Sequence, residues 1–293
     1  MNLNDLEYAR LQNLIREETG IIFNQEKRYF IESRLGPLLK RENLDGYAAL
    51  LNEIKNGKSG ELTRKVIEAV AINETSFFRD ERPFALLSEN IFPALLAEKS
   101  GKIRIWSAAA STGQEAYSIA ITAAESILDW KNDRLEIIGT DISAANLEKA
   151  SLGLYSNFEV ERGLSNARLI RHFFPQGDSW KIDQDLRNLV SFEELNLMKN
   201  FFLPGKFDII FLRNVLMYFE DMRKQEILRN VASMMSSPGY LILGASENIS
   251  PELLQGSPAG SGAPGNLLRL KKETHDGTNY YMSFDKYNTT DRD

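Results

Sequence analysis

The first 70 residues place hydrophobic side chains at helical spacing and show no strand-like alternation. Apolar residues recur three or four positions apart in four stretches, the last of which contains Leu62 and Val66. Such a period predicts amphipathic helices. Gly36 and Pro37 interrupt the second stretch, so we expect them to break or kink its helix. Residues 1–70 are therefore predicted to form a small all-helical N-terminal domain.

Beyond Gly101 the pattern changes to short apolar runs that alternate with helical stretches. The predicted strands are Ile103–Ser107, Leu135–Thr140, Leu189–Glu194, Phe207–Leu212 and Tyr240–Gly244. The predicted helices between them lie near Gly113–Leu128, Ala144–Leu152 and Met222–Met235. Strands that alternate with helices form right-handed βαβ units and a mostly parallel sheet. The fold class predicted for residues 101–272 is therefore α/β, with a doubly wound, Rossmann-like sheet.

Two segments depart from this alternation. Residues 71–100 are predicted to be a connector followed by the first helix of the larger domain, which has Asp80 as its N-cap and runs to about Glu98. Residues from about 155 to 187 are predicted to be an insert within the larger domain. The insert is expected to contain a helix near Leu164–Phe173 and a short β-hairpin.

The C-terminal part is expected to be mostly irregular. Residues 251–265 are rich in Pro, Gly, Ser and Ala, which is typical of a loop. Asn266–Lys271 is a candidate for a last edge strand. Residues 273–293 form a polar tail, which is predicted to be disordered or loosely attached.

Composition narrows the classes of function. The chain has 293 residues and no cysteine, which excludes disulfides, thiolate metal sites and a cysteine nucleophile. Its formal net charge of −6 argues against a general nucleic-acid-binding surface. No apolar run approaches the ~20 residues of a membrane span, and the N-terminus is unlike a signal peptide. We expect a cytoplasmic monomer that binds no metal or nucleic acid and is not inserted in a membrane.

Positive charge is concentrated in one N-terminal segment. Against a single acidic residue, Glu32, this segment holds five basic residues: Lys27, Arg28, Arg34, Lys40 and Arg41. Such a concentration in an acidic chain predicts an acidic protein partner.

Residues 103–118, IRIWSAAASTGQEAYS, are the most informative stretch. An apolar run ends in small residues, and a Ser-Thr-Gly turn then opens a helix. In doubly wound sheets, small residues at this position let the backbone approach a bound cofactor closely. Two companion segments, GTDIS at 139–143 and FDIIFLRNVLMYF at 207–219, join it to suggest a nucleoside-type cofactor. The sequence has no phosphate loop of the GxxxxGK[ST] kind.

Two acidic residues are candidate cofactor ligands. Glu115 follows Thr112 by three positions, so it can complete a capping box, or accept hydrogen bonds from an ammonium or amide group, or do both. Asp141 ends the second predicted strand, where a carboxylate can accept from two ribose hydroxyls. Alternatively, Asp141 caps the following helix, a role that Ser143 could take instead.

Further candidates follow a buried strand or lie in the connector. Arg213 and Asn214 come just after the fourth predicted strand, at the edge where open sheets bind ligands. Tyr218 can reach the same cleft or serve as a packing aromatic. The chain's two histidines lie in no motif. The connector adds three polar residues, for which spacing alone is a weak signal: Asn73, Thr75 and Arg79.

Four sequence blocks resemble a known family. They are INETSFFRD (72–80), RIWSAAASTGQEAYSIA (104–120), GTDISAANLEKASLGLY (139–155) and FDIIFLRNVLMYF…GYLILGASENI (207–249). The resemblance covers roughly residues 8–250 and is to the CheR-type chemotaxis receptor methyltransferases. It implies a protein-glutamate O-methyltransferase that uses S-adenosylmethionine to methylate glutamates on the cytoplasmic helices of chemoreceptors. The implied products are γ-glutamyl methyl esters and S-adenosylhomocysteine.

The resemblance also assigns roles to residues at matching motif positions. It implies that Glu115 meets the methionine end of the cofactor and that Asp141 meets the ribose. It implies that Arg79 and Tyr218 lie nearest the transferred methyl group. It implies that Asn73 and Thr75 line the cleft together with Arg79. It also implies that Asn196 and Leu197 flank the adenine, with Arg213 and Asn214 behind them.

Partners follow from the same resemblance. The family's helical domain presents a basic face to acidic receptor helices, which matches positions 27–41 here. Its insert sometimes docks a pentapeptide from a receptor's C-terminus. Here the corresponding segment, HFFPQGDSWKID (172–183), is short and lacks a glycine-rich loop, which argues against such a tether.

Two alternatives remain open at this point. One is another specificity on the same fold, such as a small acid or a different protein carboxylate. The other is a regulator that binds S-adenosylmethionine without turnover. The presence of both Arg79 and Tyr218 speaks mildly against the regulator.

Overall fold

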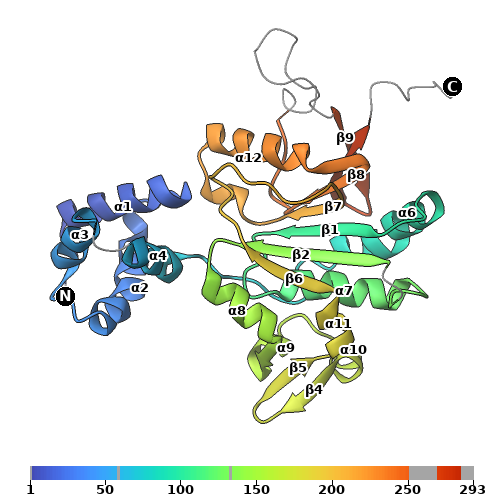
Figure 1. Cartoon of the computed structure of the whole chain (residues 1–293), viewed down its shortest axis with the longest axis horizontal. Helices are drawn as coiled ribbons and strands as arrows, with labels where there is room; N and C mark the ends of the chain where they lie inside the picture. Colours follow the sequence, from blue (N-terminus) through green and yellow to red (C-terminus); the bar gives the residue numbers. More distant parts are fainter. Residues whose placement is uncertain (1, 58–59, 132–133, 251–268, 285–293) are drawn as a thin grey trace, which may run out of the picture.

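The N-terminal part of the chain is a cluster of helices, drawn at the left of Figure 1. The computed structural model describes residues 2–57, 60–131, 134–250 and 269–284. The cluster comprises α1 (Asp5–Thr19), the 3₁₀ turn η1 (Gln25–Lys27), α2 (Arg28–Arg41), α3 (Tyr47–Lys55) and α4 (Gly60–Val70). Asn4 and Glu7 form a capping box at the start of α1, and Gly20 ends this helix in the left-handed conformation. The apolar stripes pack into a core of their own, as predicted.

The larger part is built on a seven-stranded sheet in the order β6-β2-β1-β7-β8-β10-β9. Its strands are β1 (Ile103–Ala108), β2 (Leu135–Asp141), β6 (Val190–Glu194), β7 (Phe207–Leu212), β8 (Met235–Leu243), β9 (Arg269–His275) and β10 (Thr278–Phe284). The first five strands in that order are parallel, and the last two pair antiparallel. The strand order reverses between β1 and β7, which is the switch point where such sheets bind ligands. The predicted α/β class is confirmed.

Helices cover both faces of this sheet (Figure 1). They are α5 (Arg82–Leu86), the π-helical turn η2 (Leu87–Ile91), α6 (Phe92–Glu98), α7 (Gln114–Ser126), α8 (Ala144–Leu152) and α12 (Asp221–Ser233). Ile105 packs on the face covered by α5, α6 and α7, whereas Trp106 packs on the face covered by α12. Successive strand residues point to opposite faces, and both faces are buried. This is why the central strands are apolar throughout.

The insert forms a small unit below the main sheet in Figure 1. It contains a three-stranded sheet in the order β3-β5-β4. Its elements are β3 (Leu154–Ser156), α9 (Asn157–Glu161), α10 (Asn166–His172), β4 (Phe173–Gln176), β5 (Ser179–Ile182) and α11 (Gln184–Asn188). The last of them, α11, leads back to β6 of the main sheet. The predicted helix and hairpin are both present, with Gly177 in the hairpin turn.

The expected break of the second helix at Gly36 and Pro37 is wrong, because α2 continues to Arg41. The alternative expectation of a kink there stays a prediction. Buried apolar residues lie on both sides of the proline, and their packing outweighs its local cost. Asp80 does not cap α5, because the preceding residue is Glu81, which makes no capping hydrogen bond. Asp80 is instead paired with Arg213.

The expectation of a disordered or loosely attached tail from position 273 is wrong for residues 273–284. These residues complete β9 and form β10, which pairs with β8. Tyr281 is fully buried and anchors the hairpin in the core. The candidate edge strand is present as β9 from position 269, but β10 follows it. The predicted loop at 251–265 and the last residues, 285–293, lie outside the described residues.

Candidate functional site

A cavity opens where β1, β2, β6 and β7 end, and the connector and the end of α1 complete its walls. Its empty volume, including the space open to solvent, is ≈ 980 Å³. All ten residues predicted from the sequence line this cavity: Asn73, Thr75, Arg79, Glu115, Asp141, Asn196, Leu197, Arg213, Asn214 and Tyr218.

Glu115 and Arg213 form a buried ion pair at this cavity. Glu115, in the first turn of α7, accepts hydrogen bonds from Ser107 Oγ at 2.8 Å and from Arg213 Nη1 at 3.0 Å. The capping box considered for Glu115 is absent, because the residue before α7 is Gly113 rather than Thr112. The Arg213 side chain is only 1% exposed. Its Nε has no hydrogen-bond partner among the described residues.

Asp141 lies at the end of β2 and is 8% exposed. Its carboxylate accepts hydrogen bonds from the backbone N–H groups of Ser111 at 2.9 Å and Ser143 at 3.0 Å. The N-cap of α8 is Ser143, whose side chain accepts from Asn146, so Asp141 is released from that role. The carboxylate is thus fixed by backbone groups at the cavity wall.

Burial controls the ionisation of both acids. It raises the pKa of Glu115, although the charge of Arg213 and the hydrogen bond from Ser107 act in the opposite direction. Burial also raises the pKa of Asp141, against the hydrogen bonds from its backbone donors. A positive charge next to either group favours its ionised form, so the cavity is suited to a cationic ligand.

The connector holds Arg79 in an unusual backbone segment. Phe78 and Asp80, on either side of it, have φ angles of 49° and 67°, a region that residues other than glycine rarely adopt. Arg213 secures this segment, because it donates to the carbonyl oxygen of Arg79 at 2.9 Å and to the Asp80 carboxylate at 2.7 Å. Arg213 therefore joins the connector to Glu115.

Tyr218 lines the same cavity from the turn η3 (Leu216–Tyr218). Burial raises the pKa of its hydroxyl, while the charge of Arg79 acts in the opposite direction. The phenol is therefore protonated near neutral pH and can donate a hydrogen bond.

Sequence reasoning missed the residue that shapes the loop after β7. Glu247 is 7% exposed and accepts hydrogen bonds from the backbone of Asn214, Leu216 and Gly244 at 2.8–2.9 Å. It thereby fixes Asn214, whose φ is 57°, and the turn that carries Tyr218. The sequence signal for Glu247 is weak, because it is a single acid three residues after the glycine that ends a predicted strand.

The contribution of the helical N-terminal part was also missed. Thr19 and Ile21, at the end of α1, line the cavity. Asn196 Nδ2 donates to the carbonyl oxygen of Glu18 at 2.8 Å, so a predicted adenine contact also attaches α1 to the larger part. Helix periodicity contains no information about which distant surface a helix end will touch.

Both parts of the chain match known protein families. The model of "CheR methyltransferase, SAM binding domain" matches residues 73–258, and that of "CheR methyltransferase, all-alpha domain" matches residues 6–70. The chain belongs to the CheR methyltransferase family. It is 39% identical to a chemotaxis protein methyltransferase of Vibrio anguillarum over 253 residues, which are 85% of this chain and 92% of that protein. It is 36% identical to the chemotaxis protein methyltransferase of Escherichia coli K12, covering 85% of this chain and 86% of that one.

Membership of the CheR family makes the chain a methyltransferase of chemotaxis that uses S-adenosylmethionine. The cavity fits this cofactor, because the Glu115 and Asp141 carboxylates that line it could accept hydrogen bonds from a cationic group and from hydroxyl groups. Among the described residues, no group of side chains could hold a metal ion. No helix in the described part of the chain is both long and apolar enough to span a membrane.

Proposed function

We propose that the protein transfers the methyl group of S-adenosylmethionine to glutamate side chains of chemoreceptors, forming γ-glutamyl methyl esters. We further propose that it does so in the cytoplasm and as a monomer. One observation supports the reaction above all others. Arg79 and Tyr218, which suit a carboxylate, line the same cavity as Glu115 and Asp141, which suit the cofactor.

Four residues are proposed to hold the cofactor. Asp141 would accept from the ribose hydroxyls, and Glu115 would face the ammonium group of the methionine end. Asn196 and Leu197 would flank the adenine. When bound, S-adenosylmethionine supplies an electrophilic methyl group.

The attacking group needs no catalytic base. A glutamate side chain is ionised near neutral pH, so it can act as the nucleophile without losing a proton. In agreement, no histidine lines the cavity in the part of the chain that the structure describes. The protein's tasks are then to align the carboxylate and to exclude water, and alignment alone can contribute on the order of 7–11 kcal/mol.

Arg79 and Tyr218 are proposed to orient the incoming carboxylate. A guanidinium that bound both oxygens would hold the carboxylate firmly but reduce its nucleophilicity. We propose that the two side chains bind one oxygen and leave the other free to attack. The hydrogen bonds that Arg213 donates to the backbone of Arg79 and to Asp80 support this role, because an orienting group must itself be fixed.

The test is methyl transfer to receptor cytoplasmic fragments with labelled cofactor. Esters release volatile methanol in alkali, which separates them from methylated amines. We expect Arg79→Ala to lower the rate on the order of a hundredfold, with a much smaller loss of cofactor affinity. Near-normal turnover by this variant would contradict the role of Arg79. Cofactor binding with no methylated product from the wild type would favour a regulator instead.

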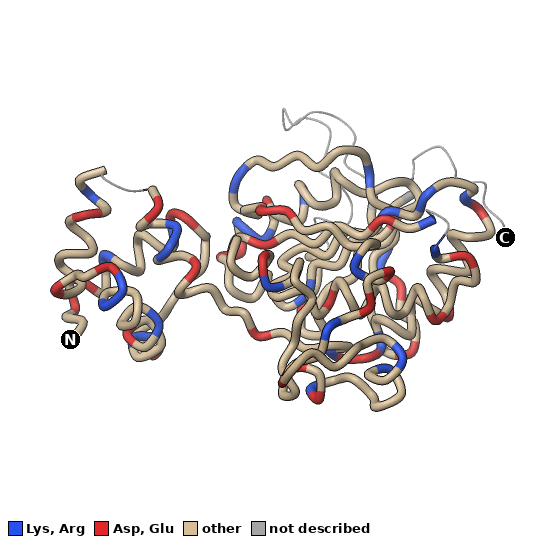
Figure 2. The backbone as a smooth tube through the Cα atoms, turned by 60° about the horizontal axis from the view of Figure 1, so that its bottom comes forward, with Lys and Arg blue, Asp and Glu red and all other residues tan. Residues whose placement is uncertain are grey.

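The receptor is proposed to bind the basic residues of the N-terminal part. Lys27, Arg34, Lys40 and Arg41 are exposed, whereas Arg28 is bonded to Asp5 and lies over an aromatic ring. Figure 2 marks basic positions in blue along this part of the backbone, interspersed with acidic positions in red.

A second hollow supports this proposal, because Lys27 and Arg34 line it together with Tyr218. An acidic segment on the basic residues would therefore lie close to the proposed methyl-transfer residues. We propose that this surface, and not a peptide tether on the insert, holds the receptor.

A further inference from the structure

The insert packs against the connector at several points. Phe77 lies edge-on to Tyr155 and Phe173 of the insert, with ring centroids 4.9 and 5.4 Å apart. A side chain at Gly163, which has φ of 107°, would overlap the carbonyl oxygen of Phe77. Arg162 pairs with Glu74 of the connector at 2.7 Å. The insert therefore contacts the connector at Glu74 and at Phe77.

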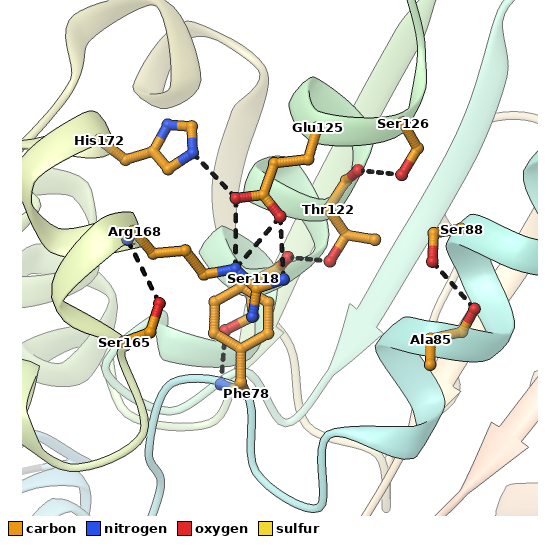
Figure 3. Close-up of polar contacts among 10 residues, drawn as sticks. All are labelled: Phe78, Ala85, Ser88, Ser118, Thr122, Glu125, Ser126, Ser165, Arg168 and His172. Atoms are coloured by element: carbon orange, nitrogen blue, oxygen red, sulfur yellow. Dashed lines mark hydrogen bonds and ion pairs between the residues drawn. The ribbon is translucent and has the colours of Figure 1, made fainter.

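Arg168 of α10 makes the most specific of these contacts. Its guanidinium carbon lies 3.8 Å from the ring centroid of Phe78, which suits a cation–π interaction. Its Nε and Nη2 donate to the Glu125 carboxylate of α7 at 2.9–3.2 Å. His172, also of α10, lies 3.2 Å from the same carboxylate, and Figure 3 shows this group around Phe78.

Glu125 is suited to hold Arg168 in place. Burial acts to raise the pKa of its carboxyl group, but the hydrogen bonds and charges of Arg168 and His172 outweigh it and lower the pKa. The carboxylate therefore remains ionised near neutral pH. Two points of attachment fix the plane of the guanidinium over Phe78, which a lysine could not do.

The segment that Arg168 covers is strained and carries Arg79. Phe78, Asp80 and Glu81 all have positive φ angles, and such a backbone persists only where surrounding contacts impose it. The Phe78 N–H donates to Ser118 Oγ of α7 at 2.9 Å, and Arg213 holds Arg79 and Asp80 from the cavity side. Arg168 adds the contact with the ring of Phe78.

We propose that the insert is a support for the catalytic connector, and that Arg168 is the positioning residue through which α10 keeps Arg79 in place. This inference rests on the proposed function, in which Arg79 orients the substrate carboxylate. It gives the insert a role in the reaction that needs no bound peptide.

The experiment compares Arg168→Met with Arg171→Met, which removes an exposed arginine of the same helix. In Arg168→Met we expect kcat for receptor methylation to fall about tenfold or more, while the Kd for S-adenosylhomocysteine changes less than about threefold. We expect amide hydrogen exchange of residues 77–82 to accelerate, with α12 unchanged. Arg171→Met should match the wild type in all three measurements.

A second pair of variants covers the case in which Arg168→Met does not fold. Gly163→Ala should give the same split between kcat and Kd. Gly177→Ala should not, because Gly177 also has a positive φ but a side chain there would touch nothing within 4 Å.

Unchanged exchange of residues 77–82 in both Arg168→Met and Gly163→Ala would overturn the inference. So would accelerated exchange with an unchanged kcat. A wild type that methylates no receptor fragment would overturn the proposed function instead, and the exchange measurement would still decide whether the insert supports the connector.

Discussion

At the scale of single residues, the central feature is the raised pKa of Glu115 in the free protein, caused by burial. A cationic cofactor favours the ionised carboxylate, so its binding should release protons. We therefore expect the affinity for S-adenosylmethionine to fall as the pH is lowered through the raised pKa of Glu115. Calorimetry in buffers of different ionisation enthalpy measures both effects. Glu115→Gln should bind the cofactor more weakly, and its affinity should depend less on pH. If the affinity of this variant changes with pH as much as that of the wild type, the pH dependence belongs to another group.

Asp141 gives a second prediction at this scale. Asn in its place keeps the shape but replaces one acceptor oxygen by a donor that faces the N–H of Ser111 or Ser143. We expect Asp141→Asn to weaken binding of S-adenosylhomocysteine about tenfold to a hundredfold, as measured by calorimetry. The control is Asp178→Asn in the exposed hairpin turn, which should bind normally. Equal affinities in the two variants would remove Asp141 from the site.

At the scale of elements, the end of α1 lines the proposed cofactor site. Gly20 has φ of 71°, and a side chain there would press on Met198 and Phe219. We expect Gly20→Ala to displace α1 and to weaken binding of S-adenosylhomocysteine several-fold, since Thr19 and Ile21 line the cavity. Gly36→Ala is the matched control, because a side chain at Gly36 meets nothing within 4 Å.

The control has its own expected outcome. Replacing a helix-interior glycine by alanine stabilises a helix by about 1 kcal/mol, so thermal unfolding of Gly36→Ala should occur at a slightly higher temperature. If Gly20→Ala and Gly36→Ala bind the cofactor equally well, α1 does not form a wall of the working site.

Elements also show how far sequence reasoning extends. The strands and helices of the parallel sheet were predictable, because their period and apolar runs are local signals. The strand β10 was not, since its polar residues resemble a tail until Tyr281 is seen to be buried. Glu115 and Asp141 were found because they follow strands in motifs. Glu247 and the end of α1 act through distant contacts that a single sequence does not record.

At the scale of the whole molecule, charge distribution should govern receptor binding. The chain is acidic overall, so an acidic partner is attracted mainly where Lys27 and Arg34 are exposed. Lys27→Glu with Arg34→Glu should lower receptor affinity about tenfold at low salt, and less at high salt. Surface plasmon resonance at two salt concentrations measures this. Charge reversal at Arg171 and Arg229, which are exposed but distant in sequence from Lys27 and Arg34, should have little effect on receptor affinity. Equal losses of affinity in the two double variants would refute a local basic site.

The proposed reaction depends on where the cofactor lies relative to Arg79 and Tyr218. A crystal structure of the protein with S-adenosylhomocysteine tests this most directly. We predict that the ligand occupies the cavity between β1 and β7, with its ribose on Asp141, its ammonium group toward Glu115 and its sulfur facing Arg79 and Tyr218. A ligand bound elsewhere, or one whose sulfur faces away from these two side chains, would contradict the account.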